Sequence, residues 1–171
     1  MPIHNFEFKA RTNKLSALEE KLLKLNPRFI GLDHQTDTYF NINSGRLKLR
    51  EGNIENSLIF YERQDLAGAK QSTVLLYQHK HNPNLKEILV KSFGVKTVVE
   101  KYRKIYFIDH VKFHFDEVQG LGTFVEVEAI DKTGTTKITE LQRQCEYFAE
   151  FFQIEAKDYV SKSYSDLMIG L

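Results

Sequence analysis

Arg46-Leu47-Lys48-Leu49-Arg50, at residues 46–50, alternates strictly between cations and leucines. This period of two predicts a β-strand with one apolar face and one charged face. The three cations then lie on the same face, roughly 7 Å apart at each step. At an effective dielectric constant near 20, unit charges at that spacing repel each other by about 2 kcal/mol per pair. Such a strand is best tolerated where an anionic group lies among its cations.

The same period of two recurs on both sides of this stretch. Strands are predicted at residues 5–11, 29–32, 36–41, 46–50, 58–63, 73–78, 97–108, 111–117 and 123–129. Their polar positions hold Lys9, Arg11, Arg46, Lys48, Arg50, Arg63, Lys101 and Arg103, and also Asn5, Glu7, Asp37, Asp116, Glu126 and Glu128. The opposite positions are apolar, so we expect one sheet face to pack under helices and the other to carry charge of both signs.

A period of three to four residues predicts helices at residues 13–25, 84–93 and 137–152, and a short one near 164–168. The third of these turns Cys145 toward its apolar side, so we interpret this thiol as a core residue. About eight strands and these helices, without βαβ alternation, predict an antiparallel α+β fold.

The composition is that of an ordinary soluble globule, with 42% hydrophobic and 27% charged residues. A chain of 171 residues without a linker predicts a single domain, residues 1–171. The 24 Lys and Arg nearly balance the 23 Asp and Glu, which disfavours a protein that coats nucleic acid or anionic membrane. The sequence has one cysteine, no secretory signal and no apolar run long enough to cross a bilayer. We therefore expect a cytoplasmic protein that binds neither nucleic acid nor membrane.

The sorting of charge leaves three interpretations open. The polar face is the solvated side of a two-layer fold, a nucleic-acid groove or, if the sheet closes into a barrel, the lining of a lumen. In a lumen the cations suit a compact polyanion of the size of a triphosphate. The carboxylates suit Mg²⁺ or Mn²⁺. His114 shares this face, and we interpret it as structural, with a proton shuttle as the alternative.

Several segments resemble the CYTH superfamily, also called the triphosphate tunnel metalloenzymes, and the resemblance covers nearly the whole chain. The most specific match is Asp116-Glu117-Val118-Gln119-Gly120-Leu121-Gly122 followed by Phe124-Val125-Glu126-Val127-Glu128. The other segments are Asn5-Phe6-Glu7-Phe8-Lys9, similar to an opening Glu-x-Glu-x-Lys strand, Asp37-Thr38-Tyr39-Phe40 with residues 46–50, Glu100-Lys101-Tyr102-Arg103 with Ile105-Tyr106-Phe107, and Lys162-Ser163-Tyr164-Ser165-Asp166-Leu167. Residues 97–128 look closest to class IV adenylyl cyclases.

The resemblance implies an eight-stranded antiparallel β-barrel, a triphosphate tunnel with helices packed on the outside. It implies that the triphosphate contacts Lys9, Arg11, Arg46, Lys48, Arg50, Arg63, Lys101 and Arg103. It also implies that Mg²⁺ or Mn²⁺ is bound by Glu7, Asp116, Glu126 and Glu128. Lys9, Arg50, Lys101 and Arg103 are the expected catalytic residues, because cations stabilise the charge that develops on the phosphates. The family often forms dimers, so a homodimer is a further expectation.

Two metal-dependent reactions share this architecture. We expect a class IV adenylyl cyclase-like enzyme that converts ATP to cyclic AMP and pyrophosphate; the alternative is a triphosphatase acting on thiamine triphosphate, tripolyphosphate or a nucleotide. Asn5 stands where the first glutamate of the opening motif belongs, which removes one negative charge from the expected metal site. This departure keeps a third alternative open, a protein that binds polyphosphate or nucleotide without turnover.

Overall fold

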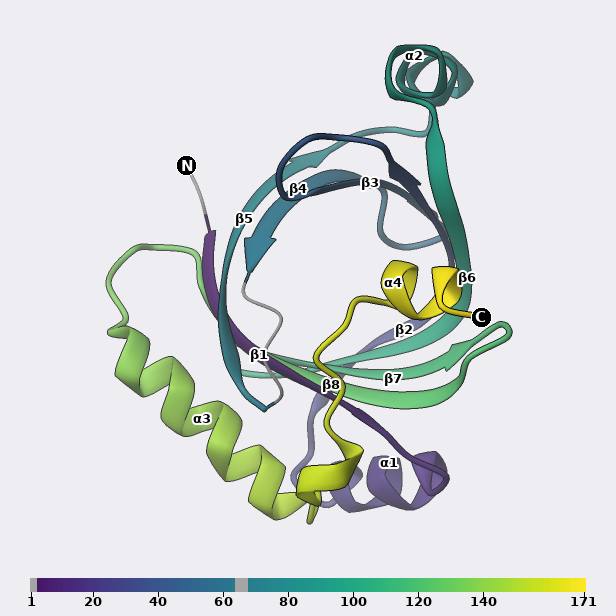
Figure 1. Ribbon diagram of the computed structural model, residues 1–171. Helices are drawn as coiled ribbons and strands as arrows, with labels where there is room; N and C mark the ends of the chain where they lie inside the picture. Colours follow the sequence, from purple (N-terminus) through teal and green to yellow (C-terminus); the bar gives the residue numbers. More distant parts are fainter. Residues whose placement is uncertain (1–2, 64–67) are drawn as a thin grey trace.

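Eight antiparallel strands close into a barrel in the computed structural model, which describes residues 3–63 and 68–171 (Figure 1). The strands are β1 (Ile3–Arg11), β2 (Arg28–Phe40), β3 (Arg46–Gly52), β4 (Ser57–Arg63), β5 (Lys70–Gln78), β6 (Val95–Ile108), β7 (Val111–Val118) and β8 (Gly122–Asp131). Their order around the barrel is β1-β5-β4-β3-β2-β6-β7-β8, and β8 pairs with β1. With helices on the outside, this arrangement confirms the predicted α+β fold and eight-stranded antiparallel barrel.

Strand β2 runs through a segment that the sequence divided into two strands, so the predicted break between residues 32 and 36 is wrong. Asp33 and Gln35 lie in this segment, and both are fully buried. The Asp33 carboxylate accepts hydrogen bonds from the backbone N–H groups of Ile54 and Glu55, each at 2.9 Å, and from Gln35 Nε2 at 2.7 Å. Buried polar groups with hydrogen-bond partners are tolerated within a strand, so the polar residues do not interrupt β2.

Strand register determines which charged side chains face one another. Because alternate residues of every strand point into the barrel, the polar positions of neighbouring strands meet in its interior. The cross-strand pairs of polar residues are Glu7–Glu128, Lys9–Glu126, Asp37–Arg50, Arg103–Asp116, Lys112–Glu128 and His114–Glu126. Cations and carboxylates therefore lie side by side on the inner wall.

Helix α3 (Ile138–Phe151) packs on the outside of β1 and β8 (Figure 1). Its Leu141 and Phe148 are buried in one core with Phe8 of β1 and Val127 of β8. Each fully buried side chain of this size contributes roughly 1.5–3 kcal/mol to folding. Cys145 lies in the same core, where burial raises the pKa of its thiol to about 12. It is a core residue, as predicted.

The remaining helices are α1 (Leu15–Leu23), α2 (Pro83–Phe93), the one-turn 3₁₀ helix η1 (Ala156–Asp158) and α4 (Tyr164–Ile169). Helix α1 lies below β1 and β8 in Figure 1, whereas α2 lies at the N-terminal end of β6. Helix α4 lies over one end of the barrel, near β6 (Figure 1). None of the helices in residues 3–63 and 68–171 has the length and apolar character needed to cross a membrane.

Candidate active site

The barrel encloses a cavity of about 690 Å³. This volume is in the range of small-molecule binding sites. The lining cations are Lys9, Lys48, Arg50, Lys101, Arg103, Lys112 and Lys132, and the lining carboxylates are Glu7, Glu55, Glu126 and Glu128. Ile59, Val74 and Leu76, from β4 and β5, add an apolar part. The polar face predicted from the sequence is therefore the wall of a lumen, which excludes the interpretation as a solvated sheet face.

The buried carboxylate of Asp37 interacts with three of the cations. Arg50 donates to it through Nε and Nη2, both at 2.9 Å, and Lys101 Nζ donates at 2.7 Å. Lys48 Nζ lies 3.5 Å from the same carboxylate. Burial alone would raise the pKa of Asp37, but Arg50, then Lys101 and Lys48, hold it well below its usual range. Asp37 and Glu55, which accepts a further hydrogen bond from Arg50 at 3.1 Å, supply two negative charges for three cations, so this part of the wall stays positive.

The two lysines of this group are depressed in pKa. Burial lowers the pKa of Lys48 to about 7 and that of Lys101 to about 8, against the opposing attraction of Asp37. Neighbouring guanidinium groups of Arg50 and Arg103 add to the lowering by repulsion. Both lysines therefore change charge near neutral pH, and an anion bound among them favours their protonated forms.

Asp116 lies behind Arg103 and is not among the residues that line the cavity. Arg103 donates to its two oxygens from Nε at 2.7 Å and from Nη2 at 2.6 Å, and the Tyr164 hydroxyl donates at 2.7 Å. Its pKa is lowered because the attraction of Arg103 exceeds the effect of burial. The structure thus places this predicted metal ligand as the counter-ion that holds Arg103, outside the lining of the cavity.

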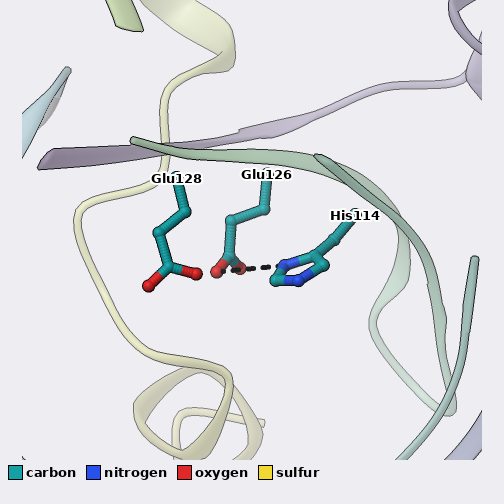
Figure 2. A group of neighbouring side chains, drawn as sticks. All are labelled: His114, Glu126 and Glu128. Atoms are coloured by element: carbon teal, nitrogen blue, oxygen red, sulfur yellow. Dashed lines mark ion pairs between the residues drawn. The ribbon is translucent and has the colours of Figure 1, made fainter. Parts of the chain in front are cut away.

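Glu126 and Glu128 of β8 and His114 of β7 project into the cavity side by side (Figure 2). One donor atom from each of them lies within 4.8 Å of the others. Burial, and then the nearby carboxylate of Glu7, raise the pKa of Glu128. Burial acts in the same direction on Glu126, but Lys9 at 3.8 Å, then the neighbouring His114 imidazole and Arg103 at 3.6 Å, hold its pKa well below the usual range. Crowded, buried carboxylates repel one another, and a divalent cation between them relieves that repulsion.

Two polar groups beside these carboxylates fit a bound cation. Asn5 is 1% exposed and donates its side-chain amide N–H to Glu128, whereas its Oδ1 accepts no hydrogen bond from the described residues. His114 is also buried, and burial lowers the pKa of its imidazole to about 4. Amide oxygen, neutral imidazole and carboxylate are all metal ligands in proteins. Glu126 and Glu128, with Glu7 close by, therefore form a site that suits Mg²⁺ or Mn²⁺.

Not every predicted phosphate ligand lies in this cavity. Lys9, Lys48, Arg50, Lys101 and Arg103 line it.

Arg11 and Arg46 do not line the cavity. Arg11 is exposed at the end of β1, and its Nη1 donates to the Leu121 carbonyl at 2.5 Å. Arg46 Nη2 lies 2.8 Å from the Asp166 carboxylate at the α4 end of the barrel. The predicted ligand Arg63 has its side chain outside the described residues.

Glu55 and Lys112 are cavity residues that the sequence analysis did not select. Glu55 comes from the β3–β4 loop, where no strand periodicity identifies an inward position, and it accepts a hydrogen bond from Arg50 Nη1 at 3.1 Å and another from Lys112. The inward position of Lys112 could have been identified from the sequence, because it lies on the same alternating face of β7 as His114. Asp37 has a similar signal on β2, and its role as an anchor for three cations follows only from the register.

The CYTH domain family model matches residues 4–164. Among curated proteins, none matches the chain. A conserved hypothetical protein from Pyrococcus furiosus has a similar structure, with a TM-score of 0.81 at 21% identity over 95% of this chain and 99% of that one. A putative adenylate cyclase from Vibrio parahaemolyticus gives 0.78 at 15% identity, over 96% and 97% of the two chains. A putative adenylyl cyclase from Hippeastrum, described as having a dominant triphosphatase activity, gives 0.64 at 15% identity, over 99% and 94%.

These structural likenesses show a shared fold over nearly the full length of each chain. The family model extends from β1 to the start of α4 and so spans the strands that build the cavity. The chain belongs to the CYTH domain family.

Proposed function

We propose that this chain is a divalent-metal-dependent enzyme that acts on a triphosphate held in the tunnel. The observation that carries the proposal is the shared cavity wall, where the lining lysines and arginines outnumber the lining carboxylates and the candidate metal ligands Glu126 and Glu128 lie beside them. Guanidinium and ammonium groups are the usual partners of phosphate oxygens. A polyanion of several phosphates matches both the excess of positive charge and the volume.

The catalytic roles that we propose fall on Lys9, Arg50, Lys101 and Arg103, all of which line the cavity. Arg50 and Arg103 are each held by a buried carboxylate, so their guanidinium groups are oriented before substrate binds. Donors oriented in advance stabilise developing negative charge without reorganisation during the reaction. When bound at Glu126 and Glu128, Mg²⁺ or Mn²⁺ would polarise the phosphoryl oxygens.

We place the cyclase reaction of ATP first among the reactions of this class. The ribose 3′-hydroxyl oxygen attacks the α-phosphorus, the bond from this phosphorus to the bridging oxygen breaks, and pyrophosphate leaves with the proton that the hydroxyl loses. The apolar part of the cavity, with Ile59, Val74 and Leu76, supports a substrate that carries an organic group beside its phosphates. The structural likeness to a putative adenylate cyclase agrees with this reaction.

A triphosphatase is the second candidate. In that reaction water attacks the γ-phosphorus of thiamine triphosphate, tripolyphosphate or a nucleotide, and the same cations neutralise the leaving group. The description of the Hippeastrum protein, which has the same fold, favours this candidate.

Product analysis by ³¹P NMR tests the proposal. The protein is incubated separately with ATP, thiamine triphosphate and tripolyphosphate, each with Mg²⁺ and with Mn²⁺. Pyrophosphate together with cyclic AMP identifies the cyclase, and orthophosphate identifies the triphosphatase. Binding without products identifies a binding protein, and the absence of both binding and products contradicts the proposal.

A pair of lysine variants provides the matched control. Lys48→Met removes a charge from the cavity wall, whereas Lys91→Met removes one from the exposed face of α2. We expect Lys48→Met to weaken triphosphate binding about tenfold and Lys91→Met to leave it unchanged. Equal affinities of the two variants would place the triphosphate outside this cavity.

Asn5→Glu restores the glutamate that the family motif has at this position. We expect tighter metal binding, because a carboxylate then replaces an amide beside Glu128. Faster turnover in this variant identifies a weakened enzyme. Tighter metal binding with no turnover favours the binding protein.

Three broader expectations also remain proposals: one domain over residues 1–171, a homodimer, and a cytoplasmic location. Light scattering on the purified protein measures the oligomeric state directly.

A further inference from the structure

His114 lies in the tunnel beside the carboxylates of Glu126 and Glu128. It lies on β7 directly across from Glu126 of β8, so the barrel register fixes the two side chains as neighbours. It is 2% exposed and points into the cavity beside Glu126 and Glu128 (Figure 2). An imidazole in this position can contact a cation that binds to the two carboxylates.

The imidazole makes no hydrogen bond through Nδ1 or Nε2 to any residue in the described part of the chain. Its Nδ1 lies 3.6 Å from Glu126 Oε1, which is longer than a hydrogen bond. A buried polar group without a partner costs about 1–3 kcal/mol, so such groups are rare in folded proteins unless a ligand completes them.

The two oxygens of Glu126 face different neighbours. Its Oε2 lies toward Lys9, at 3.8 Å, and Arg103, at 3.6 Å, whereas Oε1 lies toward His114. The Oε2 atom of Glu126 thus pairs with cations of the cavity wall, and its Oε1 atom faces His114. This division provides a carboxylate donor and an imidazole donor on the same side of the cavity.

The spacing of the donors is close to that of a metal site. The three donor atoms lie within 4.8 Å of one another. Two donors on opposite sides of an ion with bonds of 2.0–2.2 Å lie about 4.0–4.4 Å apart, and adjacent donors lie closer, so these flexible side chains need to move inward to bind one ion together. Magnesium and calcium favour oxygen ligands, whereas an imidazole nitrogen adds affinity for first-row transition metals, among which Mn²⁺ also suits carboxylate ligands.

We propose that His114 is a nitrogen ligand in a mixed site with Glu126 and Glu128, and that this site binds a first-row transition-metal ion such as Mn²⁺ in preference to Mg²⁺. The proposal rests on the cation site of the proposed function and requires no particular reaction. It revises the ligand set expected from the sequence, because His114 takes the place that was assigned to Asp116.

Pulsed electron paramagnetic resonance of the protein loaded with Mn²⁺ alone, without a triphosphate, tests the proposal. We expect modulation from a directly bound ¹⁴N nucleus, which changes to ¹⁵N frequencies when only the histidines are labelled with ¹⁵N. We expect His114→Gln to lose this modulation and to bind Mn²⁺ at least tenfold more weakly, with a smaller change for Mg²⁺. His79→Gln is the matched control, because His79 also lines the cavity but, among the described residues, is not one of the donors grouped with Glu126 and Glu128, and its Nδ1 bonds to the Lys80 carbonyl at 2.9 Å.

Several results would overturn the proposal: no binding of Mn²⁺, bound Mn²⁺ without histidine modulation in the wild-type protein, or modulation that persists in His114→Gln. Equal affinity of the wild-type protein for Mn²⁺ and Mg²⁺ would also overturn the preference. The labelled wild-type measurement does not depend on the folding of a variant. An inactive protein that shows histidine modulation contradicts only the proposed function, and an active protein without it contradicts only the histidine ligand.

Discussion

At the scale of single residues, the tunnel depends on buried ion pairs that orient its cations. Arg103 and Asp116 are 3% and 0% exposed, and they share two short hydrogen bonds. Removing one partner of a buried pair leaves an uncompensated charge, which typically costs 3–5 kcal/mol. We therefore expect Arg103 to stabilise the fold as well as to bind the triphosphate.

Arg103→Ala is expected to lower the free energy of unfolding by about 3–5 kcal/mol, because Asp116 loses its counter-ion in the barrel wall. Urea denaturation followed by circular dichroism measures the change. Arg143→Ala is the control, because Arg143 pairs with Glu140 on the exposed face of α3 and should change stability by less than about 1 kcal/mol. Similar losses in the two variants would show that the buried pair does not stabilise the fold.

At the scale of elements, α4 connects the end of the chain to the tunnel wall. A helix of six residues is not stable by itself in water, so it needs contacts at its N-terminus. Ser163 and Asp166 form a capping box there, the Tyr164 hydroxyl donates to Asp116, and the Asp166 carboxylate also pairs with Arg46. Arg46, expected from the sequence to bind phosphate, is therefore a contact of α4 in this structure.

Ser163→Ala removes the side-chain cap of α4 and is expected to cost about 1 kcal/mol. The loss should appear as faster amide hydrogen exchange in α4, with unchanged protection in α3. Ser16→Ala, at an exposed position inside α1, is the matched control and should stay within about 0.5 kcal/mol of the wild-type protein. Unchanged exchange in α4 would show that its packing, and not the cap, holds it.

At the scale of the whole molecule, a chain with a net charge of only +1 concentrates cations inside its barrel. The barrel achieves this by directing one phase of every strand inward, so charges that are far apart in sequence share one small volume. The depressed pKa values of Lys48 and Lys101, about 7 and about 8, result from this crowding together with burial.

Triphosphate binding is therefore expected to weaken as the pH rises from 7 to 9. The free protein loses the two lysine charges in this range, whereas the terminal phosphate, whose last pKa is about 6, keeps its charge. Affinity should fall by up to about tenfold per pH unit for each lysine that must regain its proton. Calorimetry at pH 8 in buffers of different ionisation enthalpy should detect proton uptake on binding, reduced in Lys48→Met. Constant affinity without proton uptake between pH 7 and 9 would contradict the inward placement of these charges.

Which face of each strand is charged can be predicted from the amino-acid sequence alone, because the period of two is a local property of the extended backbone. The sequence therefore predicted the barrel-lining positions of Lys9, Lys48, Arg50, Lys101 and Arg103. The prediction that the sheet closes into a barrel came from the resemblance to a known family, because periodicity alone does not distinguish a barrel from an open sheet.

Which charges lie next to one another depends on how the strands pair in the folded barrel. Register placed Asp37 among three cations, placed Asp116 behind Arg103, and brought His114 to the carboxylates of β8. It also left Arg11 outside the cavity, although Arg11 shares the phase of Lys9, because the end of β1 lies beyond the lumen. The physical reason is that the phase of a strand follows from neighbouring residues, whereas its partners, its register and the position of its ends depend on the closure of the whole barrel.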